Sequence, residues 1–132
     1  MRKATFEDMP LLVEMGKRFM GRAEIPVLPE QDAAEETLRG LIERGVIFMT
    51  DVGAIGGAIV NPWYSKTWKI AVTWFWWSDD GNGARLLRAF ERWGIENGAD
   101  QITMTGRRDE MAHRVLSRMG YEATETAYGK VV

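Results

Sequence analysis

The stretch that decides the fold is Trp74-Phe75-Trp76-Trp77-Ser78-Asp79-Asp80-Gly81-Asn82-Gly83-Ala84-Arg85-Leu86-Leu87. It joins a tryptophan-rich apolar run to an amphipathic segment through a short turn with two glycines. The apolar run predicts a strand and the amphipathic segment predicts a helix. The unpaired amides of a helix N-terminus favour an anion, above all a phosphate, when glycines let the backbone approach it closely. Glycines are also common in ordinary strand-to-helix turns, so the rest of the chain has to support this interpretation.

The composition restricts the function classes. A chain of 132 residues suits one domain spanning 1–132. With 17 basic and 19 acidic residues the formal net charge is -2, which disfavours nucleic acid and anionic membranes as partners. The absence of cysteine excludes disulfides, thiolate metal ligands and a cysteine nucleophile, and no metal site is expected. Without an apolar secretion core or a run of roughly 20 apolar residues, a cytoplasmic location is expected.

Helical and extended segments alternate along the chain. Apolar spacing and end signals predict helices over residues 7–20, 32–44, 109–119 and from the glycine turn to about residue 98. Strands are predicted at 4–6, 46–50, 54–60, 69–77, 100–105, 121–123 and 126–131. The resulting order is β-α-α-β-β-β-α-β-α-β-β. The strand after the glycine-turn helix follows after a two-residue break, as a parallel β-α-β unit requires.

Two details of the predicted strands bear on the site. Gly56-Gly57 lies inside the second strand of a predicted hairpin, which implies a bulge, or another backbone or a ligand close by. The tryptophan-rich strand is apolar on both faces, which is typical of a central strand covered on both sides. Regular alternation groups the strand residues by face: on one face Ile70, Val72, Trp74 and Trp76, and on the other Ala71, Thr73, Phe75 and Trp77.

The glycine turn and the last predicted helix carry two short motifs. Gly81-Asn82-Gly83-Ala84-Arg85-Leu86-Leu87, and Ala112 followed by Gly120-Tyr121, resemble the GCN5-related N-acetyltransferase (GNAT) superfamily in this order of elements. In that family, amides of an Arg/Gln-x-x-Gly-x-Gly/Ala signature hold the coenzyme A pyrophosphate, and the two glycines of the turn match its small positions. The resemblance implies an α+β fold of the α/β/α type. Its central sheet is expected to be mixed, mostly antiparallel, with about six to seven strands and about four helices.

The resemblance also implies an activity. The protein is expected to be an acetyl-CoA-dependent N-acetyltransferase, with acetyl-CoA as cosubstrate and a primary amine of a small molecule or a protein as acceptor, acetylated by direct attack. The implied coenzyme-binding residues are Trp76, Trp77, Ser78, Gly81, Asn82, Gly83, Ala84 and Arg85. Of these, Trp77 would line the acyl or pantetheine channel, and Arg85 in the first helical turn would reach a phosphate.

Three positions depart from the family's pattern. Ser78 stands where the signature has Arg or Gln, and Asp79-Asp80 before the first glycine should repel a pyrophosphate unless they point away or pair with Arg85 or Arg107. Leu116 stands where many members keep a tyrosine that protonates the departing thiolate. Thr73 stands where many keep a glutamate base.

The attacking amine needs a base, because a lysine-like amine has a pKa of about 10.4. Glu24 is the candidate base, and Tyr121 or Tyr128 the candidate acid. Each also has a structural interpretation. Glu24 could be a solvated loop charge, Tyr121 a hydrophobic lid after the last helix, and Tyr128 a residue packed on a strand face. The single histidine, His113, is interpreted as a surface imidazole.

Two other functions stay open. The missing acid, base and leading arginine favour a catalytically inactive GNAT-fold binding or assembly module. The cluster of aromatic residues is compatible with a domain that forms a homodimer through an aromatic surface.

Overall fold

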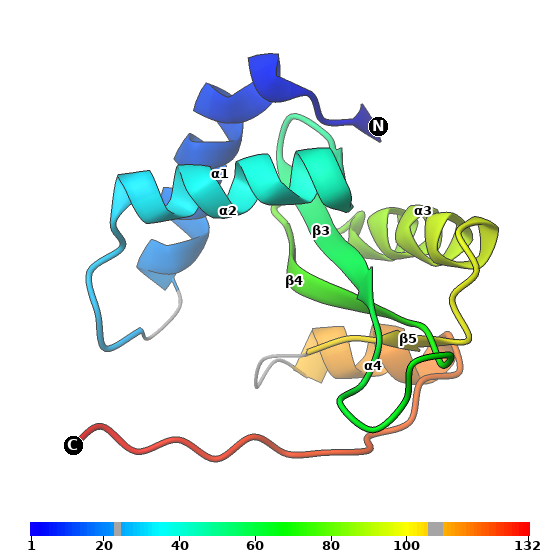
Figure 1. Ribbon diagram of the computed structural model, residues 1–132. Helices are drawn as coiled ribbons and strands as arrows, with labels where there is room; N and C mark the ends of the chain where they lie inside the picture. Colours follow the sequence, from blue (N-terminus) through cyan, green and yellow to red (C-terminus); the bar gives the residue numbers. More distant parts are fainter. Residues whose placement is uncertain (23–24, 106–109) are drawn as a thin grey trace.

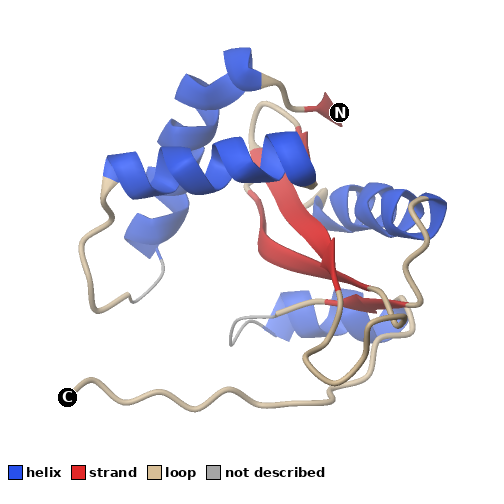
Figure 2. Ribbon diagram, in the orientation of Figure 1, coloured by secondary structure: helices blue, strands red, loops and turns tan. Residues whose placement is uncertain are grey.

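Helices and strands follow one another in a computed structural model that describes residues 1–22, 25–105 and 110–132 (Figures 1 and 2). In chain order the elements are β1 (Arg2–Lys3), a 3-10 helix η1 (Phe6–Asp8), α1 (Met9–Arg22), α2 (Gln31–Arg44), β2 (Val46–Met49), β3 (Gly53–Val60), β4 (Ile70–Ser78), α3 (Gly83–Glu96), β5 (Gln101–Thr103) and α4 (Glu110–Arg118). No helix in these ranges is both long and apolar enough to cross a membrane.

The sheet is mixed and five-stranded, in the order β1-β2-β3-β4-β5. Neighbours from β1 to β4 are antiparallel, and β4 pairs with β5 in parallel, with α3 as the connection. The predicted parallel β-α-β unit and the mixed α+β class are therefore confirmed. The first strand is Arg2–Lys3 and not 4–6, because Thr5 begins the 3-10 helix instead.

The predicted sheet of six to seven strands is wrong, because residues 121–123 and 126–131 form no strand. The end of α4 explains the first part of the difference. Gly120 has a φ of +88°, and the amides of Gly120 and Tyr121 donate to the carbonyls of Ser117 and Leu116. This is a Schellman C-cap, which uses the Tyr121 amide to end the helix. The following residues run as an exposed tail beside no other strand of the described chain.

Two apolar clusters lie on opposite faces of the sheet (Figure 1). One is built between the sheet and α1 and α2, around Leu12, Met15 and Ile47. The other lies beneath α3, around Leu87 and Phe90, and its edge is formed by Leu116 of α4 and by Met119, which directly follows α4. This α/β/α layering follows from the sequence, because each helix has one apolar face and the central strand has two.

Asp8 fixes the entry to the first helical layer. Its carboxylate accepts the Thr5 amide at 2.8 Å and two guanidinium bonds from Arg2, which lower the pKa of Asp8 to about 2. We expect Asp8→Ala to lower the free energy of unfolding by about 1–2 kcal/mol near pH 7, the value of a lost helix cap. Urea denaturation of both chains measures this difference.

The same measurement at low pH tests the cause. A pKa lowered from about 3.9 in the unfolded chain to about 2 stabilises the fold above about pH 4, and this contribution disappears as the pH falls to about 2. The cost of Asp8→Ala should therefore shrink over that range. Glu7→Ala, at an exposed neighbour in the same 3-10 helix, should cost less than about 0.5 kcal/mol. An equal cost for the two variants would contradict the assigned role of Asp8.

Candidate active site

The central strand β4 contains a β-bulge at Trp74. Gly56 pairs with Phe75 and Gly57 pairs with Thr73, so Trp74 is left without a partner on β3. The side chains confirm the shift: Ala71 and Trp76 both face the α3 side, although regular alternation would put residues five apart on opposite faces. The predicted grouping is therefore wrong across the bulge, because Trp76 shares a face with Ala71 while Phe75 and Trp77 lie on the other face. The irregularity expected at the two glycines lies in the strand opposite them.

The two glycines allow β4 to lie this close. A Cβ atom on Gly57 would collide with the carbonyl oxygen of Val72 and lie 2.8 Å from the ring of Phe90. A Cβ atom on Gly56 would lie 2.5 Å from the ring of Phe75. The close backbone approach predicted from the sequence is thus confirmed, and the approaching backbone is that of β4.

Beyond the bulge β4 separates from its parallel neighbour. β5 pairs only with Ile70, Ala71 and Val72, and the last link is the hydroxyl of Thr73, which donates to the carbonyl of Thr103 at 3.3 Å. From Trp74 to Ser78 the edge of β4 that faces away from β3 has no strand partner among the described residues. Its backbone groups are therefore available to a ligand on that side.

The turn after β4 is organised by Asp80. Its carboxylate accepts the hydroxyl of Ser78 at 2.5 Å, and the amide and side-chain nitrogen of Asn82 at 3.0 and 2.9 Å. These hydrogen bonds lower the pKa of Asp80 to about 2, so the carboxyl is ionised at neutral pH. The sequence analysis expected Asp80 to repel a bound anion. In the structure its carboxylate instead accepts the hydrogen bonds that hold the turn together.

Three amides of the turn and the first helical turn remain open. The N–H groups of Gly81, Gly83 and Ala84 have no acceptor among the described residues. Gly81 has a φ of +76°, a conformation that favours glycine, and no atom lies within 4 Å of where its Cβ would be. The exposed side chain of Arg85 follows in the same helical turn. Open amides, the positive end of the helix dipole and a cation therefore meet at one end of α3.

Gly83 serves packing as well as the turn. A Cβ atom there would lie 3.3 Å from the indole of Trp76, whose Nε1 donates to the Gly83 carbonyl at 2.9 Å. A valine at Gly83 would consequently press on Trp76 and disturb the start of the helix. Gly83 is for this reason a poor position for a substitution meant to spare the fold.

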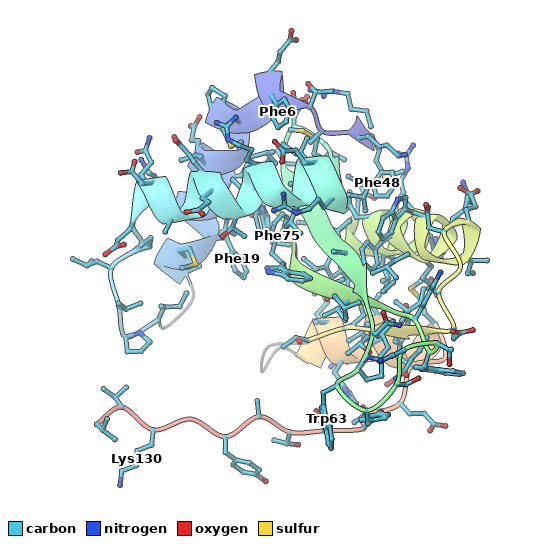
Figure 3. All side chains as sticks on the ribbon, in the orientation of Figure 1. Phe6, Phe19, Phe48, Trp63, Phe75 and Lys130 are labelled. Carbon is cyan, nitrogen blue, oxygen red and sulfur yellow. The ribbon has the colours of Figure 1, made fainter. Side chains whose placement is uncertain are left out.

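Trp77 points to the opposite face from Trp76. Its ring stacks on Phe19 of α1, with centroids 4.9 Å apart, and its centroid lies 4.6 Å from that of Phe75. Figure 3 labels these two phenylalanines. Its buried indole Nε1 has no hydrogen-bond partner among the described residues. The two tryptophans predicted to contact one ligand therefore line different faces of the sheet at its open end.

An ion pair joins α1 to the turn. Arg22, at the end of α1, lies 2.5 Å from the carboxylate of Asp79. Together with the Phe19–Trp77 stack it fastens the end of α1 beside the strand, and it offsets the charge of Asp79. The partners expected for the two aspartates were Arg85 or Arg107, and the observed partner of Asp79 is instead Arg22, which lies far away in the chain and belongs to no motif.

The two candidate catalytic tyrosines are not brought together in the described part of the chain. Glu24 lies outside the described residues. Tyr121 packs in the α3 cluster with its hydroxyl buried and without a well-formed hydrogen bond, and burial together with the nearby Glu91 raises its pKa. Tyr128 is 93% exposed in the C-terminal tail. The described part of the chain thus places neither tyrosine hydroxyl at the open edge of β4.

The structure explains the residues that differ from the family's pattern. Thr73 is buried and committed to the Thr103 carbonyl, and Leu116 packs against the α3 cluster. The side chain of His113 is exposed, as expected of a surface imidazole. These residues support the fold, and none of the three supplies a carboxylate or a phenol to the site.

Protein-family models and curated proteins gave no match to the sequence. Solved structures did match. A predicted acetyltransferase from Clostridium acetobutylicum, solved with acetyl-CoA, superposes with a TM-score of 0.78 at 15% identity, over 98% of this chain and 94% of that one. The chain has the GNAT acetyltransferase fold.

Two further structures with this GNAT fold show the same likeness. A Trypanosoma brucei acetyltransferase has a TM-score of 0.70 at 14% identity, over 99% of this chain and 97% of that one. An aminoglycoside acetyltransferase from an uncultured soil metagenomic sample, solved with sisomicin, has a TM-score of 0.68 at 13% identity, over 99% and 95%. Identities this low establish the GNAT fold, and the activity has to be argued from the site.

Proposed function

We propose that this protein binds acetyl-CoA at the junction of β4 and α3 and transfers the acetyl group to a primary amine. The observation that carries the proposal is the conjunction, in a GNAT fold, of open amides at the start of α3 with an unpaired edge of β4 beyond the Trp74 bulge. The first feature suits phosphate oxygens, and the second suits an extended amide-containing chain that ends in a thioester.

The phosphate end is held by this chain's backbone. The amides of Gly81, Gly83 and Ala84 donate to pyrophosphate oxygens, and Arg85 adds a charge-assisted hydrogen bond. Asp79 and Asp80 weaken the attraction less than the sequence suggests, because one is paired with Arg22 and the other is engaged with Ser78 and Asn82.

The acetyl end lies along the free edge of β4. When bound, the coenzyme supplies an acetyl thioester. An amide of the unpaired segment from Trp74 to Ser78 donates to its carbonyl oxygen, which stabilises the negative charge that develops as the amine attacks. The carbon–nitrogen bond forms as the carbon–sulfur bond breaks, and the amine proton leaves to a base. Water is the simplest base and acid here, because the described side chains at this edge offer neither.

The missing acid and base favour a second candidate, a binding module that keeps the coenzyme site without turnover. The observations behind it are the buried Thr73 and the buried hydroxyl of Tyr121. Release of free thiol from acetyl-CoA in the presence of a broad panel of amines separates the two. We expect amine-dependent release that rises with pH, since a larger fraction of the amine is then unprotonated. If acetyl-CoA bound but no thiol were released, the binding module would be the correct function and the transferase proposal would be wrong.

One substitution tests the electrostatics of the turn. Asp80→Asn keeps an acceptor for the Asn82 amide but removes a negative charge next to the proposed pyrophosphate site. We expect acetyl-CoA to bind about two- to fourfold more tightly, because a weak charge repulsion in water-like surroundings is removed. Calorimetric titration at low and high salt measures it, and the gain should shrink at high salt. Weaker binding to Asp80→Asn would mean that the hydrogen bonds of the Asp80 carboxylate, which hold the turn, matter more for binding than its charge repulsion.

A further inference from the structure

The loop between β3 and β4, residues 61–69, carries three large aromatic side chains at the surface. Trp63 is 95% exposed, Tyr64 71% and Trp68 44%. In Figure 1 this aromatic loop projects from the end of the sheet, and Figure 3 shows Trp63 at its outer end. None of the three rings belongs to either apolar cluster. An exposed aromatic group of this kind marks a contact surface, because the fold itself makes little use of it.

Hydrogen bonds hold the aromatic loop in one shape. The Ser65 amide donates to the Pro62 carbonyl at 3.1 Å, and the Ser65 hydroxyl accepts the Trp68 amide at 3.0 Å. The side-chain nitrogen of Asn61 donates to the Trp68 carbonyl at 2.7 Å. The indole of Trp68 donates to the side chain of Gln101 in β5 at 3.0 Å. The loop is therefore closed on itself and tied to the sheet, so that its outer end is presented on a preformed support.

The two outer rings form a wedge. The centroids of Trp63 and Tyr64 lie 5.4 Å apart, and the ring planes meet at 89°. Two rings set edge to face do not offer the parallel faces on which successive bases of a nucleic acid stack. Tryptophan and tyrosine are instead the side chains enriched where a bilayer meets water, because each has an apolar ring and a polar group.

The charge of the aromatic loop differs from that of the whole chain. The loop contains Lys66 and Lys69 and no acidic residue, although the formal net charge of the protein is -2. Both lysines are exposed, and neither forms an ion pair among the described residues. Asp100 lies at the base of the loop, where its carboxylate accepts the Lys69 amide at 2.9 Å. Lysines beside an interfacial aromatic wedge complement anionic lipid headgroups.

We propose that the aromatic loop docks the protein on an anionic lipid surface, with Trp63 and Tyr64 inserted among the headgroups and Lys66 against their phosphates. Burial of the rings and attraction of the lysines act together, and reversible docking on lipid commonly needs two such contributions. Two lysines alone are few for a nucleic acid, whose binding depends on neutralising many phosphates.

Docking through this loop leaves the proposed coenzyme site free. The loop enters β4 and the glycine turn leaves it, so the nine residues of the strand separate the two by about 30 Å. The acetyl-CoA affinity of a loop variant should therefore equal that of the parent chain, whether or not the variant docks.

Cosedimentation with lipid vesicles tests the docking. One set of vesicles is phosphatidylcholine alone, and the other also contains about 30% phosphatidylserine, an anionic lipid. We expect the full chain to bind the anionic vesicles and not the neutral ones, and to be released as the salt concentration rises. The emission of the parent should shift to the blue on binding, and Trp63→Phe should reduce this shift while the chain still binds.

Two substitutions in the loop have matched controls in the C-terminal tail. Trp63→Ala should lower the vesicle partition coefficient about tenfold, the value of one partly buried large side chain. Lys66→Glu should lower it at least about fivefold. Tyr128→Ala and Lys130→Glu remove an aromatic ring and reverse a charge at exposed positions outside the loop. Their partition coefficients should stay within about twofold of the parent's.

Several results would overturn the docking. One is the absence of binding to the anionic vesicles, and another is an equal loss in the loop variants and the tail variants. A lipid-free dimer that Trp63→Ala dissociates would assign the loop to a second copy of the chain. Retention of a single-stranded oligonucleotide in place of vesicles would assign it to nucleic acid. Circular dichroism of each variant shows that the fold is kept.

Discussion

Gly57→Ala should destabilise the fold by about 3 kcal/mol or more, at the upper end of overpacking effects in a core. The added methyl group would meet the Val72 carbonyl and the ring of Phe90, and the residue is fully buried. A backbone carbonyl cannot rotate away as a side chain can, so β3 and β4 would have to separate. Thermal and urea denaturation measure the loss, and the change would also displace the bulge at Trp74 on which the proposed site depends.

Two other glycines serve as controls for Gly57. Gly56→Ala would press on the end of the Phe75 ring, which can move, so its cost should be smaller. Gly16→Ala, inside α1 with no atom within 4 Å of the new methyl, should be neutral or stabilising by about 0.5–1 kcal/mol. If Gly57→Ala proved as mild as Gly16→Ala, the register that sets Gly57 opposite Thr73 would be contradicted.

Arg85→Glu should weaken acetyl-CoA binding about ten- to hundredfold. The change removes a charge-assisted hydrogen bond to phosphate, worth about 1.5–3 kcal/mol, and adds a repulsive charge. It should not weaken the helix, since a glutamate in the first turn interacts favourably with the helix dipole. Titration calorimetry measures the affinity, and urea denaturation shows whether the stability is kept.

Arg88→Glu is the matched control for Arg85→Glu. Arg88 is also exposed on α3 and the net charge changes equally, but it lies beyond the first turn. Its effect on affinity should stay within about threefold, as expected for a screened long-range charge. Equal losses for both variants would mean that coenzyme binding responds to the overall charge, and the phosphate site at the start of α3 would be wrong.

The sequence predicted most of the fold because its signals are local. The helical periodicities of residues 32–44 and the glycine-turn helix, and the two-faced apolar strand before it, agree with the tertiary arrangement that buries them. The terminal strands failed for a non-local reason. The segment after Tyr121 has strand-like residues, but a strand needs a partner, and the described chain provides none beside it.

The turn that carries the proposed site was predicted from the sequence, but its detailed geometry was not. Gly81 and Gly83 mark the turn, yet the alternation rule could not show that Trp74 is skipped. The skip puts Trp76 on the same face as Ala71, and Trp77 on the other face. The ion pair between Asp79 and Arg22 could not be predicted either, because the two residues lie far apart in the chain. By contrast, the role of Asp80 had a local signal, since acidic and hydroxyl side chains two residues apart commonly bond to turn backbones.

The most direct test of the coenzyme site is an NMR titration of isotope-labelled protein with acetyl-CoA. Amide shifts follow each residue, so the experiment reports both binding and its place. We expect saturable changes that are largest at the amides of Gly81, Gly83 and Ala84, with the Trp76 and Trp77 indole signals responding nearby. No saturable change at millimolar acetyl-CoA, or changes centred away from the β4–α3 junction, would contradict the proposed site.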